Sequence, residues 1–237
     1  MLTLVVERST RRPGWALFRD ATCLQEFTAD GEPSLAPEWL ATLHAALEPS
    51  NVTLAAIDRF VAGIGPGSFS GIRATVAGLQ GMALPGGQPL LGLSSAAALA
   101  FAVLNERAAA NQHTPVAIVG DARRERLWCA VYTLRCNQLA LCSTTGIATP
   151  AHTAADFILT TAADLPRHLP PETVVVSPDL ERLSTRLAAV LPATAAAPML
   201  RMPSAADVGR LLLSDPTTAH VDPVPIYLHP AVAEVRT

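Results

Sequence analysis

The stretch GIGPGSFSGIRAT, residues 63–75, holds four glycines, one proline and two serines within its first nine positions. It follows the apolar segment IDRFVA and precedes a run of small and apolar residues that continues to Leu84. A strand, a glycine-rich turn and a helix in this order occur in phosphate sites and around exposed catalytic nucleophiles. The chemistry of this turn therefore decides whether the chain is expected to be an enzyme.

Three catalytic templates fail against the turn. A P-loop requires a lysine after its last glycine, whereas Ile72 follows Gly71 and the chain contains no lysine. The dinucleotide fingerprint G-x-G-x-x-G does not match, because the spacing from Gly67 to Gly71 is one residue too long. A nucleophile elbow needs serine at the centre of G-x-S-x-G, and Phe69 stands there.

What remains is backbone geometry. Glycine tolerates positive φ, proline fixes one dihedral, and Ser68 or Ser70 can cap a helix that begins near Gly71. Backbone N–H groups at a helix start can also attract an anion. The residues favour a structural turn and leave the anion site open. The motif turn comprises Gly65, Pro66, Gly67, Ser68, Phe69, Ser70, Gly71 and Arg73.

The apolar patterns predict an α/β fold whose second half repeats the first in thinner form. Each half begins with a strand meander, which is followed by helices and single strands. Segments 36–49, 71–84, 94–109, 154–165, 180–191 and 204–215 are predicted helices, and 105–114 is a candidate linker. We expect an N-terminal subdomain over 1–104 and a smaller C-terminal one over 114–237, with the last helix and the extended tail packing back on the first.

Composition narrows the function classes. Only 16% of the 237 residues are charged, the net charge is −3, and no basic block suggests nucleic-acid binding by this chain alone. The N-terminus reads as a strand rather than a signal peptide, and the apolar run at 96–104 is too short to span a bilayer. We expect a soluble cytoplasmic protein without membrane contact. The cysteines, which form no C-x-x-C pair, are expected to be buried thiols: Cys23, Cys129, Cys136 and Cys142.

Segments across nearly the whole chain resemble one family. GPGSFSGIRATVAGLQGMALPGGQPLLGLSSAAALA resembles the GPGSFTGLR signature of the TsaB (YeaZ) family, with Ser70 and Ile72 where Thr and Leu are usual. GDARRERLWCAVY, PSAADVGRLL and PIYLHPAVA are similar to further segments of that family. The resemblance implies a ribonuclease-H-like, actin-type ATPase duplication with two mixed-sheet subdomains. It also implies a non-catalytic partner of TsaD and TsaE in forming N6-threonylcarbamoyladenosine beside the tRNA anticodon, with tRNA contacted only through the complex.

The same resemblance indicates the positions at which related proteins carry metal-binding and nucleotide-binding residues, and this chain has other residue types there. TsaD carries an H-x-x-x-H metal pair, which would fall near Ser95 and Leu99. Glu7 stands where actin-type ATPases keep an aspartate, and Asp121 is either its second-half counterpart or a turn initiator. We therefore expect no catalytic residue, no metal and no cofactor of its own, with a degenerate nucleotide site at Glu7 and Asp121. Whether ATP or ADP binds at the complex interface stays open.

In this family, TsaB and TsaD bind each other through helices of their N-terminal halves. The resemblance therefore implies that the N-terminal helices of this chain form a TsaD-binding face. The isolated chain could form a homodimer through the same face. Gly78→Leu is expected to block this pairing in a folded monomer. The expected face comprises Leu40, Leu43, Leu47, Ala74, Val76, Ala77, Gly78, Leu79, Gly81 and Met82. Two other classes remain as alternatives: a peptidase, which needs metal ligands or a nucleophile beside a base, and a small-molecule kinase of the same fold.

Overall fold

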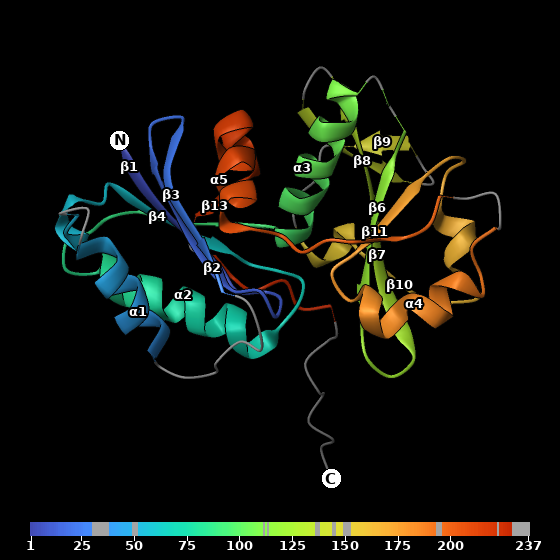
Figure 1. Cartoon of the computed structure of the whole chain (residues 1–237), viewed down its shortest axis with the longest axis horizontal. Coiled ribbons are helices and arrows are strands. Elements are labelled where there is room, and N and C mark those ends of the chain that lie inside the picture. The colour runs from blue at the N-terminus through green and yellow to red at the C-terminus, as the bar shows by residue number, and fades with distance from the viewer. Residues whose placement is uncertain are drawn as a thin grey trace, which may run out of the picture.

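A computed structural model describes residues 1–29, 38–48, 52–110, 112, 114–135, 138–143, 146–148, 153–192, 196–221 and 223–228. Two mixed sheets stand side by side, with helices between them and on their outer faces (Figure 1). The helices are α1 (Glu38–Leu47), α2 (Phe69–Ala83), α3 (Ser95–Ala109), α4 (Leu180–Ala188) and α5 (Ala205–Ser214). None of these helices is long and apolar enough to cross a bilayer.

The first sheet has the strand order β13-β5-β4-β1-β2-β3. Its strands are β1 (Leu2–Glu7), β2 (Gly14–Arg19), β3 (Thr22–Thr28), β4 (Arg59–Gly63), β5 (Leu90–Leu93) and β13 (His220–Val221). β1 pairs antiparallel with β2 and parallel with β4, and β4 pairs parallel with β5. Every residue of β1 is buried, as expected for a central strand that is covered on both faces.

The second sheet repeats this plan with the order β12-β11-β6-β7-β8-β9. Its strands are β6 (Val116–Asp121), β7 (Arg126–Arg135), β8 (Gln138–Ser143), β9 (Gly146–Ala148), β10 (Ile158–Thr161), β11 (Val174–Ser177) and β12 (Met199–Leu200). β6 pairs antiparallel with β7 and parallel with β11, in the same way as β1 pairs with β2 and β4. The repeated strand order confirms the ribonuclease-H-like, actin-type duplication.

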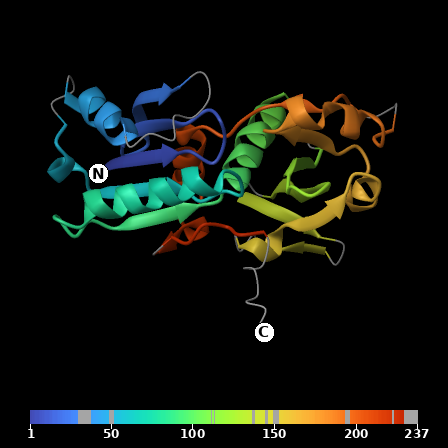
Figure 2. The same cartoon turned by 90° about the horizontal axis from the view of Figure 1, so that it is seen from below.

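Helices join the two halves, which we call the first and second lobe after their sheets. α5 packs on β1 and β2, α3 packs on β6 and β7, and α3 and α5 contact each other between the sheets (Figures 1 and 2). Arg201, just before α5, pairs with Glu106 of α3 through two hydrogen bonds. β13 then extends the first sheet, although it follows the whole second lobe in sequence. The subdomain boundary drawn from the sequence stays a prediction.

Two local predictions are wrong. The helix expected over 154–165 is replaced by the strand β10, which pairs antiparallel with β7. The linker expected from residue 105 begins inside α3, which continues to Ala109, and Asn105 donates a side-chain hydrogen bond to the Phe101 carbonyl one turn earlier. Cys129 is buried as predicted, but Cys23 and Cys142 are only half-buried, and Cys136 lies outside the described residues.

Candidate functional site

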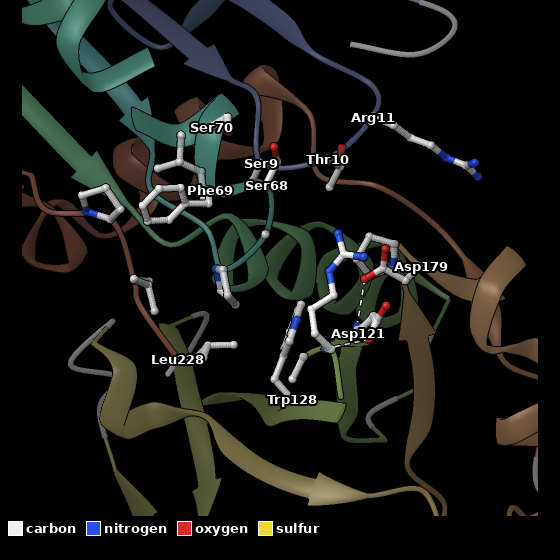
Figure 3. Close-up of a pocket in the computed structure, with 18 of the residues that line it drawn as sticks. Ser9, Thr10, Arg11, Ser68, Phe69, Ser70, Asp121, Trp128, Asp179 and Leu228 are labelled. Atoms are coloured by element: carbon white, nitrogen blue, oxygen red, sulfur yellow. Dashed lines mark hydrogen bonds between the residues drawn. The ribbon is translucent and has the colours of Figure 1, made fainter. Parts of the chain in front are cut away.

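A cleft of about 1000 Å³ opens between the two lobes. On one side it is lined by the β1–β2 hairpin at residues 9–11 and by the start of α2, and on the other by residues 121–123 and the start of α4. Figure 3 shows Phe69 on one wall and Asp121 with Asp179 on the opposite wall. The motif turn therefore lies at the cleft.

The first turn of α2 is built by its cap. Ser68 is the N-cap residue, and its hydroxyl oxygen accepts a hydrogen bond from the Gly71 N–H at 3.3 Å. Of the two serines that the sequence left open as caps, Ser68 is the one used. A Cβ on Gly71 would lie 2.2 Å from the Arg8 carbonyl oxygen, so only glycine lets α2 approach the end of β1 this closely.

The other half of the turn is fixed by the junction of β5 and α3. Gly65 has φ +92, a conformation that favours glycine. Its N–H donates to the Ser95 hydroxyl oxygen at 3.0 Å, and its carbonyl accepts from the Ser95 N–H at 2.8 Å and from the Ser94 hydroxyl at 3.2 Å. The turn is thus held from both sides by hydrogen bonds of the chain itself, which supports the structural interpretation.

Glu7 lies behind the turn rather than in the cleft. Its side chain is fully buried, and its carboxylate accepts hydrogen bonds from the Ser9 N–H at 2.5 Å and from the Ser95 hydroxyl at 2.6 Å. A Cβ on Gly63 would lie 1.9 Å from the Glu7 carboxylate, so the interior around this group is full. Glu7 therefore connects the end of β1 to the start of α3.

The positions that would carry an H-x-x-x-H pair are used for packing. Ser95 donates to Glu7, and Leu99 has no exposed surface in the core. Among the residues that the structure describes, no three His, Cys, Asp or Glu side chains gather as a metal site would require. Of the six histidines, His113, His152 and His229 lie outside the described residues. At these two positions α3 thus carries one side chain that is hydrogen-bonded to Glu7 and one that packs in the apolar core.

The buried Glu7 gives a pH-dependent prediction. Burial raises the pKa of Glu7 above its usual 4.5. The hydrogen bonds from Ser9 and Ser95 lower this pKa, but their effect is smaller than that of burial. The folded state therefore holds this proton to higher pH than the unfolded state, and the stability from Glu7 declines as pH rises from the unfolded pKa through the folded one. Glu7→Gln is expected to match or exceed the wild-type melting temperature near neutral pH, with the difference shrinking toward pH 4.5.

Thermal unfolding of both proteins between about pH 5 and about pH 8 measures this difference. Glu7→Ala is the control, because it leaves the Ser9 N–H and the Ser95 hydroxyl without their acceptor and opens a cavity. It is expected to lose about 2 to 4 kcal/mol of unfolding free energy at the acidic end of this range, to lose less as pH rises, and to stay less stable than Glu7→Gln at every pH. A Glu7→Gln protein that is as unstable as Glu7→Ala at neutral pH would show that the carboxylate must be charged.

Asp121 acts at the start of the β6–β7 turn. Its carboxylate accepts from the Arg123 N–H at 2.8 Å, and its own N–H donates to Asp179 at 2.9 Å. Arg182 of α4 lies 3.6 Å from the Asp121 carboxylate. Residues 123–125, which begin two positions after Asp121, all have positive φ, from 49 to 64. These contacts support the turn-initiating role that was one of the two alternatives for Asp121.

Only some residues of the predicted partner face are exposed on the surface of the chain. Leu43, Leu47, Val76 and Leu79 are buried in the chain's own core, and Leu40 and Met82 are half-buried. A Cβ on Gly78 would lie 2.5 Å from the Trp39 ring of α1, so Gly78→Leu would disrupt the chain's own α1–α2 packing and cannot test an interface. The exposed members are Ala74, Ala77 and Gly81.

Several residues of the cleft were not singled out by the sequence. Arg11 of the β1–β2 hairpin forms an ion pair with Glu181 of α4 across the cleft. Residues 225–228 line the cleft, and the Ile226 N–H donates to the Ile64 carbonyl at 2.9 Å, next to the motif turn. The sequence predicted only an extended tail here, because no local pattern specifies contacts over such a separation.

Comparison with known proteins adds a family and a fold. The family model of TsaD, described as tRNA N6-adenosine threonylcarbamoyltransferase, matches residues 37–166, which is more than half of the chain. No curated protein matches the chain. The crystal structure of an uncharacterized protein with similarity to peptidase YeaZ from Pseudomonas aeruginosa has a TM-score of 0.73 at 22% identity, over 96% of this chain and 99% of that chain. YeaZ from Pseudomonas aeruginosa has a TM-score of 0.69 at 20% identity, over 94% and 97%.

Proposed function

Because the chain belongs to the TsaD family of tRNA N6-adenosine threonylcarbamoyltransferases, we propose that it is a non-catalytic partner of TsaD in this modification. TsaD would transfer the threonylcarbamoyl group to the adenosine beside the anticodon. This chain would complete the complex, together with TsaE, and would meet tRNA only within it. ATP or ADP would bind only at the interface of the complex, and the complex would act in the cytoplasm.

One observation carries the non-catalytic assignment. Ser95 and Leu99 occupy the positions of the metal-binding histidine pair that the family resemblance places on α3. Ser95 is committed to Glu7 by a hydrogen bond of 2.6 Å, and Leu99 is part of the apolar core. Neither side chain offers the imidazole nitrogen that such a pair provides. A family member with serine and leucine at these two positions of α3 keeps the fold but lacks the histidine pair that would bind the metal.

The exposed side of α2 is the docking face that this function requires. Ala74, Ala77 and Gly81 are exposed and recur at helical spacing, so a partner helix could approach the α2 backbone closely. A Cβ on Gly81 would meet no atom within 4 Å, which leaves open space at this point. The opposite side of α2 packs on β4, β1 and β5 and is unavailable. The same exposed face would also serve a homodimer of the isolated chain.

The proposal is tested by mixing the purified chain with TsaD from the same cell. Size-exclusion chromatography with light scattering is expected to show a complex that contains both proteins, and adding TsaD is expected to dissociate any homodimer. The chain alone is expected to show no ATP turnover. Steady ATP turnover with a small-molecule acceptor, together with no TsaD complex, would contradict the proposal and support the kinase alternative.

A further inference from the structure

The cleft combines exposed aromatic rings with unbalanced positive charge. Phe69 begins α2 and is 54% exposed, although it is a large apolar side chain. Tyr227 is 42% exposed, and its ring centroid lies 5.5 Å from that of Phe69 with the planes tilted by 45°. The Arg73 guanidinium lies 5.0 Å from the centroid of the Phe69 ring. Two exposed rings and a cation thus lie together at one wall of the cleft.

The acidic side chains of the cleft are already paired. Glu181 pairs with Arg11, Asp179 with Arg182, and Asp121 also lies near Arg182. Two other arginines line the cleft from opposite walls, Arg73 from α2 and Arg123 from the β6–β7 turn. Within the described parts of the chain, neither of them has an ion pair with an acidic side chain. The cleft therefore carries a local excess of positive charge, although the whole chain has a net charge of −3.

The backbone adds to this charge. Phe69 and Ser70, the first residues of α2, both line the cleft, so the positive end of the helix dipole faces it. Arg123 is the first of three consecutive residues with positive φ, a conformation that costs energy for non-glycine residues. This turn presents Arg123 at the cleft. A ligand that satisfies the whole arrangement needs a flat ring and a negative charge.

We propose that this cleft binds an unpaired nucleotide of RNA, with the base stacked at Phe69 and Tyr227 and the phosphates on either side of it contacted by Arg73 and Arg123. Stacking on aromatic side chains and arginine contacts to phosphate are how proteins hold unpaired RNA. A nucleotide has both required parts in one unit. The inference rests on the function proposed above, which brings a tRNA to the complex, and gives this chain a direct contact with it.

The test uses the complex of this chain with TsaD and a short RNA hairpin that carries a photoreactive thiouridine in its single-stranded loop. Irradiation is expected to attach the RNA to this chain at a peptide containing Phe69 or Tyr227. Phe69→Ala and Tyr227→Ala are each expected to lower the crosslink yield at matched RNA concentration by about ten-fold, the loss of one stacked base. Phe69→Tyr keeps the ring and is expected to retain the crosslink.

Charge is tested separately. Arg73→Gln and Arg123→Gln are each expected to weaken the crosslink at moderate salt and to make it less salt-dependent, because each removes one phosphate contact. Two controls on other surfaces are expected to change nothing: Met199→Ala, which truncates a residue that is 42% exposed on β12, and the exposed Arg19→Gln on β2.

Three results would overturn the inference: crosslinks that map only to TsaD or to another surface of this chain, equal losses in Met199→Ala, or competition by free AMP without any crosslink to the RNA loop. Competition by the unlabelled hairpin but not by AMP supports RNA as the source of the nucleotide. The same variants are scored for TsaD binding and thermal unfolding. Retained TsaD binding without the crosslink would reject this site and leave the proposed partner function standing.

Discussion

Gly71→Ala is expected to lower the free energy of unfolding by about 3 kcal/mol or more, whereas Gly81→Ala ten residues later in the same helix is expected to raise it. A methyl group on Gly71 would lie 2.2 Å from the Arg8 carbonyl oxygen, which belongs to backbone that cannot move aside cheaply. On Gly81 it would meet nothing within 4 Å. There the change from glycine to alanine adds up to about 1 kcal/mol of helix stability.

Urea unfolding of both variants beside the wild type measures the two effects. Gly78→Ala provides an intermediate case, because its methyl group would lie 2.5 Å from the Trp39 ring, a side chain that can shift. The expected order of stability is Gly81→Ala, wild type, Gly78→Ala, Gly71→Ala. If Gly71→Ala unfolds at the same urea concentration as the wild type, α2 does not lie close enough to the Arg8 carbonyl for a methyl group on residue 71 to clash with it.

Gly81→Leu is expected to weaken binding to TsaD by about five-fold to about 150-fold, since overpacking a close helix contact costs about 1 to 3 kcal/mol and about 1.4 kcal/mol is a factor of ten. The open space around Gly81 means that the monomer tolerates the larger side chain. Binding is measured by titration calorimetry with purified TsaD, and thermal unfolding of the variant checks that it is folded.

The matched control is Ala188→Leu, the same kind of enlargement at an exposed position of α4 in the second lobe. It is expected to bind TsaD as the wild type does. Gly81→Ala should lose little affinity, because a methyl group still permits close helix packing. A Gly81→Leu protein with wild-type affinity would show that TsaD docks on a different surface.

The sequence predicted the fold because its strands and caps are local features. The apolar β1, the two meanders and the Ser68 cap follow from residues close together in the chain, and this cap is present. Residues 158–161 were misjudged because the alanines around them favour a helix. Pairing with β7, which is distant in sequence, instead makes them a strand. Tertiary pairing overrides propensity at such places.

Less of the cleft and of the α2 face could be predicted from the sequence. α1 and α2 carry apolar or small residues on several faces, so the sequence could not tell that Leu43 and Leu79 face the core while Ala77 faces outward. The approach of Phe69 to Tyr227 joins residues far apart in the chain, and no local pattern announces it. The burial of Glu7 against Ser95 was equally hidden, because it depends on the parallel pairing that aligns β1, β4 and β5.

We propose that this chain supports the modification without performing its chemistry. Reconstitution of threonylcarbamoyl transfer to unmodified tRNA, with purified TsaD, TsaE and the threonylcarbamoyl donor, measures this role. Modified adenosine is expected when this chain is present together with TsaD, a large loss when it is omitted, and none when it replaces TsaD. Equal modification without this chain, or transfer by this chain in the absence of TsaD, would contradict this proposal.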